Sequence, residues 1–157
     1  MIEQLSFFFT IEMIYLWLNL GVLPFWLLLI FFSRSKICNL FVTSIFPFII
    51  LAVIYIYLIY DFFVSGYDFL GNFNLYLGLD ELRSLLTDTS FLIIFWLHFI
   101  AINLFCGSWI VRDSQKYMIS KILIFFPLII TYFTGPVGIF IYWLIRIFFA
   151  KRISLYD

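Results

Sequence analysis

The chain has 157 residues, of which 66% are hydrophobic, 24% aromatic and only 11% charged. Soluble globular domains carry roughly 25% charged residues, so this composition excludes a water-soluble fold and predicts a polytopic membrane protein. The nine basic and nine acidic residues cancel, which argues against a nucleic-acid partner because phosphate binding needs a clustered basic face.

Four apolar segments are long enough to cross a bilayer, which takes about 20 helical residues. They cover residues 6–32, 40–64, 89–111 and 122–150. Backbone groups in hydrocarbon must be satisfied within each segment, so the expected fold class is all-α, a polytopic transmembrane helix bundle of about four spans. We expect residues 1–157 to form a single integral membrane domain. The first segment follows neither a basic region nor a small-residue cleavage site, which indicates a retained span and not a signal peptide.

The connection between the second and third segments carries leucines at helical spacing. Leu75, Leu79, Leu82 and Leu86 share one face. This pattern predicts a short helix near residues 75–87 that lies in the membrane interface. An ordinary polar loop with scattered leucines is the alternative.

The last segment is interrupted by Gly135 and Pro136 near its middle. Proline removes a backbone donor and clashes one turn back, so we expect a kink or a break there. A straight helix over 122–150 would extend about 42 Å, which exceeds the bilayer core. A kinked full span or a re-entrant helical hairpin would each absorb the excess.

Basic residues help to choose between these two forms. They lie mainly in the first and third connections, at Arg34, Lys36, Arg112, Lys116 and Lys121. The positive-inside rule places these connections in the cytoplasm or its equivalent. Four full crossings would leave the C-terminal basic residues on the opposite side, whereas a re-entrant segment would return them to the basic side. We favour the kinked full span, because Arg146, Lys151 and Arg152 could snorkel from a helix end.

The third segment contains "WLHFIAINLF" (96–105), with polar residues deep in an apolar run. Hydrocarbon offers His98 and Asn103 no partner, so we expect them to face the first and last spans and to form a buried polar node. They are five residues apart, about 140° around a helix, so a single two-residue site is not expected. Asn19 lies inside the first span in the same way. Function and packing both remain open for these residues.

The sequence carries no signal for a metal or a nucleotide. It has no CxxC, HExxH, Walker A or Rossmann glycine pattern, and one histidine cannot build a multi-histidine iron site. Cys38 and Cys106 give no disulfide signal. We therefore expect no cofactor, and an enzyme of this kind would work by proton transfer from a few buried polar groups.

Four stretches occur in the order and spacing of one known family. They are "NLGVLPFWLLLIFFSRS" (19–35), "FPFIILAVIYIYLI" (46–59), "WLHFIAINLFCGSWIVRD" (96–113) and "PLIITYFTGPVGIFIY" (127–142). The chain resembles the abscisic-acid-deficient-four-like membrane proteins over roughly residues 15–148. These include plant proteins linked to neoxanthin formation. The third and fourth stretches are the specific ones, since H-x4-[D/N]-L-F-x-G-x-W-I-x-x-D followed by T-x-x-x-G-P-x-G is not a generic apolar pattern.

For the plant members, the resemblance implies a carotenoid isomerase step that converts an epoxide into an allenic alcohol without redox change. His98 and Asp113 match the family's histidine and acid, and are the candidate catalytic residues. Position 103, usually aspartate in the family, is Asn103 here, and an amide cannot transfer the proton. The candidate substrate-binding residues are Asn19, Trp26, Asn103, Trp109 and Thr131.

Three functions therefore stay open at the level of sequence. The first is a membrane protein that binds a carotenoid or a similar long apolar lipid. The second is a cofactor-free carotenoid isomerase. The third is an accessory subunit of a larger membrane complex, or a homo-oligomer. The expected location is an integral position in a bacterial inner membrane, or in a thylakoid or plastid membrane.

Overall fold

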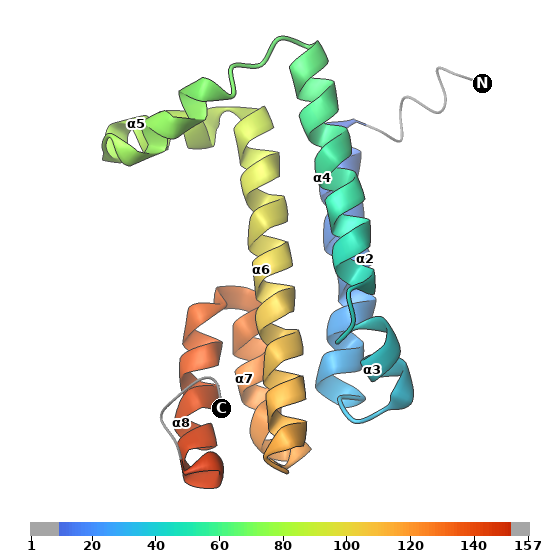
Figure 1. Ribbon diagram of the computed structural model, residues 1–157. Helices are drawn as coiled ribbons and strands as arrows, with labels where there is room; N and C mark the ends of the chain where they lie inside the picture. The colour runs from blue at the N-terminus through green and yellow to red at the C-terminus, as the bar shows by residue number, and fades with distance from the viewer. Residues whose placement is uncertain (1–9, 152–157) are drawn as a thin grey trace, which may run out of the picture. The chain divides into compact units, whose positions relative to one another are not determined.

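A computed structural model describes residues 10–151, and the regular elements in that part of the chain are all helices (Figure 1). In chain order they are α2 (Ile11–Phe31), α3 (Lys36–Phe41), α4 (Phe46–Val64), the 3₁₀-helix η1 (Leu70–Tyr76), α5 (Leu79–Thr87), α6 (Thr89–Lys116), α7 (Lys121–Thr134) and α8 (Pro136–Ala150). The predicted all-α class is confirmed for these residues. The start of the first predicted span and Arg152 lie outside them.

Within the described chain, three helical segments are long and apolar enough to cross a membrane. They are Ile11–Phe31, Lys36–Val64 and Thr89–Lys116, close to the first three predicted segments. The middle one contains both α3 and α4. The predicted count of four spans is not confirmed.

The chain divides into two compact units, and α2 and α6 each contribute one half to each unit. Unit 1 is formed by Met1–Asn19 and Phe48–Ile100, and unit 2 by Leu20–Pro47 and Ala101–Asp157. The single domain expected over residues 1–157 stays a prediction.

In unit 2 the last apolar segment is a helical hairpin. α7 ends at Gly135, whose positive φ of 56° suits a residue without Cβ, and Pro136 begins α8 where a missing N–H costs nothing. The two helices then run side by side in opposite directions (Figure 1). With 14 and 15 residues, each extends only about 22 Å, less than the bilayer core. A single kinked helix over 122–150 is therefore wrong, whereas the predicted break at Gly135 and Pro136 is confirmed.

The hairpin brings basic residues together at one end of unit 2. Arg34 donates a hydrogen bond to the carbonyl of Ile119, at 2.9 Å, so the first and third connections lie against each other. Arg146 near the end of α8 pairs with Asp113 near the end of α6. The basic side chains at this end are Arg34, Lys36, Arg112, Lys116, Lys121, Arg146 and Lys151. Arg146 therefore lies at the same end as the other basic residues. The favoured full crossing required it to lie at the opposite end.

The connection in unit 1 contains two short helices where the sequence predicted one. Leu75 belongs to η1, and an extended Gly78 with φ 171° separates it from α5. In α5 the leucines still fall on one face, at Leu79, Leu82 and Leu86, with the charged residues turned away. The amphipathic helix is thus shorter than predicted. Its position in the membrane interface stays a prediction.

A tyrosine holds the loop that precedes η1. The Tyr67 hydroxyl donates to Asn72 Oδ1 at 2.6 Å. Burial raises the pKa of Tyr67, and the carboxylates of Asp88 and Asp68 raise it further, while the hydrogen bond to Asn72 lowers it. The phenol therefore remains a protonated donor at neutral pH.

Candidate functional site

A buried ion pair closes the basic end of unit 2. Asp113 Oδ2 accepts from Arg146 Nε at 2.7 Å and from the Tyr142 hydroxyl at 2.6 Å. Arg146 is only 1% exposed, and its guanidinium lies over the Tyr117 ring, 4.7 Å from the centroid. Trp109 packs edge-on against Tyr142. One helix of the hairpin, α8, therefore meets the third span, α6, around one carboxylate.

This geometry makes Asp113 an acceptor of hydrogen bonds. Both donors come from α8, one turn apart at Tyr142 and Arg146. A charge buried in this way is stable only when its partner is present. The arrangement suits a clasp between α6 and α8, in which Asp113 Oδ2 accepts from two donors. Trp109, a candidate substrate contact, is part of the same packing.

The second polar contact lies at the other end of the hairpin. Asn103 Nδ2 donates to the Tyr132 carbonyl at 3.3 Å. That carbonyl belongs to the last turn of α7, where the helix itself supplies no donor. A Cβ on Gly135 would collide with Asn103 Oδ1, so the amide lies directly against the turn. The prediction that Asn103 faces the last span is confirmed.

The remaining candidates in unit 2 take part in close helix packing. Trp26 is buried and lies edge-on to Tyr132, and a Cβ on Gly107 would come within 2.8 Å of its ring. Thr131 donates to the Pro127 carbonyl at 2.7 Å and faces Gly138 of α8. Small residues at such positions let helices approach closely.

His98 lies elsewhere, in unit 1, and its side chain is exposed. Its ring packs edge-on against Tyr55 of α4, with centroids 5.1 Å apart, and Nδ1 lies 3.3 Å from the Ile94 carbonyl of its own helix. The partner is therefore on the second span and not on the first. His98 and Asn103 thus each contact a different neighbour, and the polar node that the sequence predicted for them stays a prediction. Asn19 also bonds within its helix, to the Tyr15 carbonyl at 2.7 Å.

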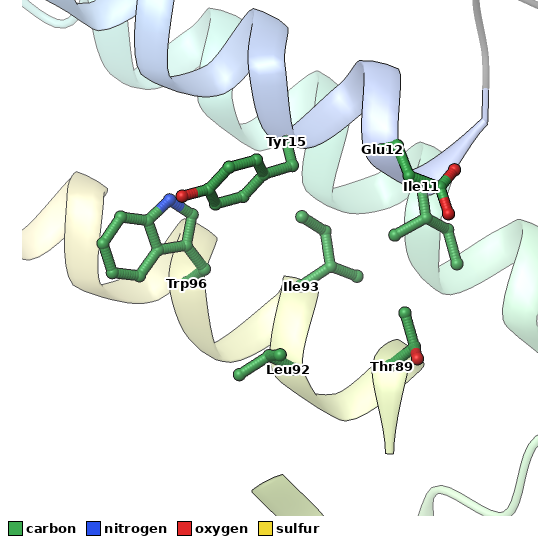
Figure 2. A pocket seen from close by; sticks show the side chains of 7 residues that line it. All are labelled: Ile11, Glu12, Tyr15, Thr89, Leu92, Ile93 and Trp96. Atoms are coloured by element: carbon green, nitrogen blue, oxygen red, sulfur yellow. The ribbon is translucent and has the colours of Figure 1, made fainter. Parts of the chain in front are cut away.

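Unit 1 contains a cavity of about 420 Å³ between the first turns of α2 and α6 (Figure 2). From α2 it is lined by Ile11, Glu12 and Tyr15, and from α6 by Thr89, Leu92, Ile93 and Trp96. The four α6 residues are spaced three, four and seven positions apart, which places them on one helical face. His98 follows Trp96 by two residues, roughly 200° around the helix, and so points to another side.

The polar groups of this cavity are unevenly placed. Glu12 and Thr89 stand in the first helical turns, whereas Trp96 lies two turns deeper. Among residues 10–151, the buried indole nitrogen of Trp96 has no hydrogen-bond partner. Trp96 also faces the Tyr15 ring, with centroids 5.9 Å apart. The cavity is thus mostly apolar, with Glu12 and Thr89 at the first helical turns and the indole of Trp96 two turns further along α6.

The candidate site residues predicted from the sequence include none of the residues that line this cavity. Trp96 begins the stretch that contains His98, but a tryptophan in an apolar run usually indicates only a packed side chain. The spacing of Thr89, Leu92, Ile93 and Trp96 was a usable signal, since it marks one face. Within the described residues, no three His, Cys, Asp or Glu side chains are placed to hold a metal ion.

Apolar helices of spanning length and buried polar contacts between them define a multi-pass membrane protein. The model of the ABA DEFICIENT 4-like family matches residues 13–142, which is most of the chain. The chain belongs to the ABA DEFICIENT 4-like family. Neither the curated proteins nor the solved structures compared with it give a match.

Proposed function

We propose that this membrane protein binds a long apolar lipid, such as a carotenoid, in the unit 1 cavity. The observation that carries the proposal is the cavity itself, about 420 Å³ in volume and lined mostly by aliphatic and aromatic side chains. Ligand pockets are typically concave, mostly apolar and marked by a few polar groups. One end of a carotenoid, or an acyl chain, is a long apolar group that suits such a pocket. Membership of the family supports the same ligand class.

The test is purification from the native membrane in a mild detergent, followed by an absorption spectrum and extraction of the bound lipid. The proposal expects a long apolar lipid to co-purify in a fixed ratio to the protein. A variant that fills the cavity, Ile93→Trp, should reduce that ratio, whereas Ile102→Trp on an exposed position of α6 should leave it unchanged. Equal lipid content in the two variants would contradict the site.

Catalysis by His98 is the second candidate, because this histidine is exposed beside the Tyr55 ring. An imidazole next to a phenol could exchange a proton with a ligand that approaches from the bilayer. For this role, a ligand held in the unit 1 cavity would also have to extend to His98, which points to another side of α6. His98→Phe in a pigment-making host tests this role, with the substrate-to-product ratio as readout. An unchanged ratio removes the isomerase proposal and leaves lipid binding intact.

For the membrane itself, we propose that the basic end of unit 2 faces the cytoplasm or its equivalent. The positive-inside rule supports this orientation, and the hairpin brings Arg146 and Lys151 to the same end as Arg34 and Lys36. The α7–α8 hairpin would then enter the bilayer from that side and return to it. A bacterial inner membrane and a plastid membrane are both compatible with this orientation.

A further inference from the structure

The unit 1 cavity contains a donor that the protein leaves unused. The indole nitrogen of Trp96 is buried and makes no hydrogen bond within the described chain. Nearly all buried polar groups in proteins have a partner, because an unsatisfied one forfeits its hydrogen bond to water. Tryptophan offers a donor and no acceptor on this nitrogen. A missing partner must therefore be an acceptor, such as an oxygen atom.

The position of Trp96 tells where such an oxygen would lie. The seven residues from Thr89 to Trp96 rise about 10 Å along α6, so the indole stands well below the first turn. Between them, Leu92 and Ile93 offer only apolar surface to the cavity. A lipid that reached Trp96 would pass apolar walls and end at a single N–H donor.

Tyr15 lies next to Trp96 in the cavity. Its ring faces Trp96, and its hydroxyl lies beside the indole nitrogen in the view of Figure 2. The side chain is 49% exposed, so it has room to turn outward. A rotation of Tyr15 would uncover the nitrogen to a ligand that fills the cavity.

We propose that Trp96 is the specificity-determining residue of the cavity, which takes an oxygen-bearing lipid and hydrogen-bonds its oxygen to the indole N–H. This rests on the proposed function and adds a requirement to it. A pure hydrocarbon can fill the cavity but leaves the donor without a partner. A hydroxyl or keto oxygen of a substituted isoprenoid satisfies it, and so does an ester oxygen of a phospholipid.

The experiment compares three ligands on the purified full chain in detergent. They are a hydrocarbon carotene, a ring-hydroxylated carotenoid and a phosphatidylcholine. Induced circular dichroism in the visible range measures the two carotenoids, and native mass spectrometry measures retained phospholipid. Trp96→Phe removes the donor and keeps an aromatic ring. Trp17→Phe, at an exposed tryptophan of the same unit, is the matched control.

We expect an oxygen-bearing ligand to bind about tenfold more tightly than the carotene, as one hydrogen bond allows. Trp96→Phe should remove that advantage, leave the carotene affinity unchanged and preserve the far-ultraviolet spectrum, whereas Trp17→Phe should change none of these. Which ligand responds identifies the source of the oxygen. If Trp96→Phe weakens the binding of all three ligands equally, or if the parent chain binds all three with equal affinity, Trp96 does not determine specificity. Lipid binding by the cavity would still stand. Absence of any binding overturns the proposed function as well.

Discussion

Asn103 supplies a donor at a point where the fold requires one. The carbonyl of Tyr132 ends α7 and accepts from the Asn103 amide at 3.3 Å. A carboxylate has no hydrogen to give when ionised, so aspartate would turn an attraction into a repulsion between two oxygens. At residue scale, the hairpin turn thus gives the amide of Asn103 a structural role.

Asn103→Asp should therefore destabilise the chain by about 1–3 kcal/mol, the cost of leaving a buried polar group without its partner. Asn103→Leu should cost a similar amount. The measurement is unfolding by sodium dodecyl sulfate, followed by far-ultraviolet circular dichroism. Asn74→Asp, at an exposed site in η1, is the control with no expected change. A stability of Asn103→Asp equal to that of the control would disprove the capping role.

Asp113 and Arg146 form the other residue-scale case. Removal of one partner leaves a buried charge alone, which typically costs about 3–5 kcal/mol. Arg146→Met should thus destabilise strongly, whereas the double variant with Asp113→Leu should recover much of the loss. Arg112→Met, next to the clasp and exposed, provides the control. The same detergent titration compares the parent chain, Arg146→Met, Asp113→Leu, the double variant and the control, and additive effects of the two single changes would argue against direct coupling.

At the scale of elements, the hairpin is held at both of its ends. Asn103 lies against the turn, and Asp113 binds the far end of α8, ten residues or about 15 Å further along α6. Between them, Gly138 lies so close to α7 that a Cβ would collide with Thr131. Many of the residues that carry the family resemblance therefore position this hairpin on α6.

The hairpin makes a definite prediction about sidedness. A cysteine at Lys36 and one at Lys151 should be labelled by an impermeant maleimide from the same side of the membrane. A cysteine at Asp80 should be labelled from the other side, because the segment Lys36–Val64 between them is long and apolar enough to cross the membrane. The background replaces both native cysteines by alanine. Labelling of the Lys151 and Asp80 positions from one common side would show that the last segment crosses completely.

α5 gives a second prediction at this scale. Leu79, Leu82 and Leu86 form its apolar face, and a helix of this kind lies in the plane of the membrane interface. Tryptophan at position 82 should then be quenched strongly by brominated lipids, whereas tryptophan at Ser84 should be quenched weakly. Each variant is read as a difference from the parent chain, which has five tryptophans. Equal quenching at both positions would indicate a loop that stands away from the bilayer.

For the whole molecule, local sequence predicted most helices and few of their partners. Apolar runs fixed the three long segments, and Gly135 with Pro136 marked the break. The reversal at that break depends on Arg146, whose partner Asp113 lies 33 positions away, a distance at which no local pattern reports contact. His98 drew attention as a lone polar residue, while Trp96 was overlooked because its polar atom is one nitrogen in a large apolar ring. Tertiary packing decided each of these cases.

For the whole molecule, the proposed function depends on one claim: a membrane lipid occupies the unit 1 cavity. A photoreactive oxygen-bearing lipid in the bilayer, followed by peptide mass spectrometry, tests it most directly. We expect adducts concentrated on Ile11–Tyr15 and Thr89–Trp96, and their loss when the same lipid is added without the reactive group. Adducts that simply follow exposure, with Phe63 and Phe133 labelled as strongly as the cavity and no competition, would contradict the account.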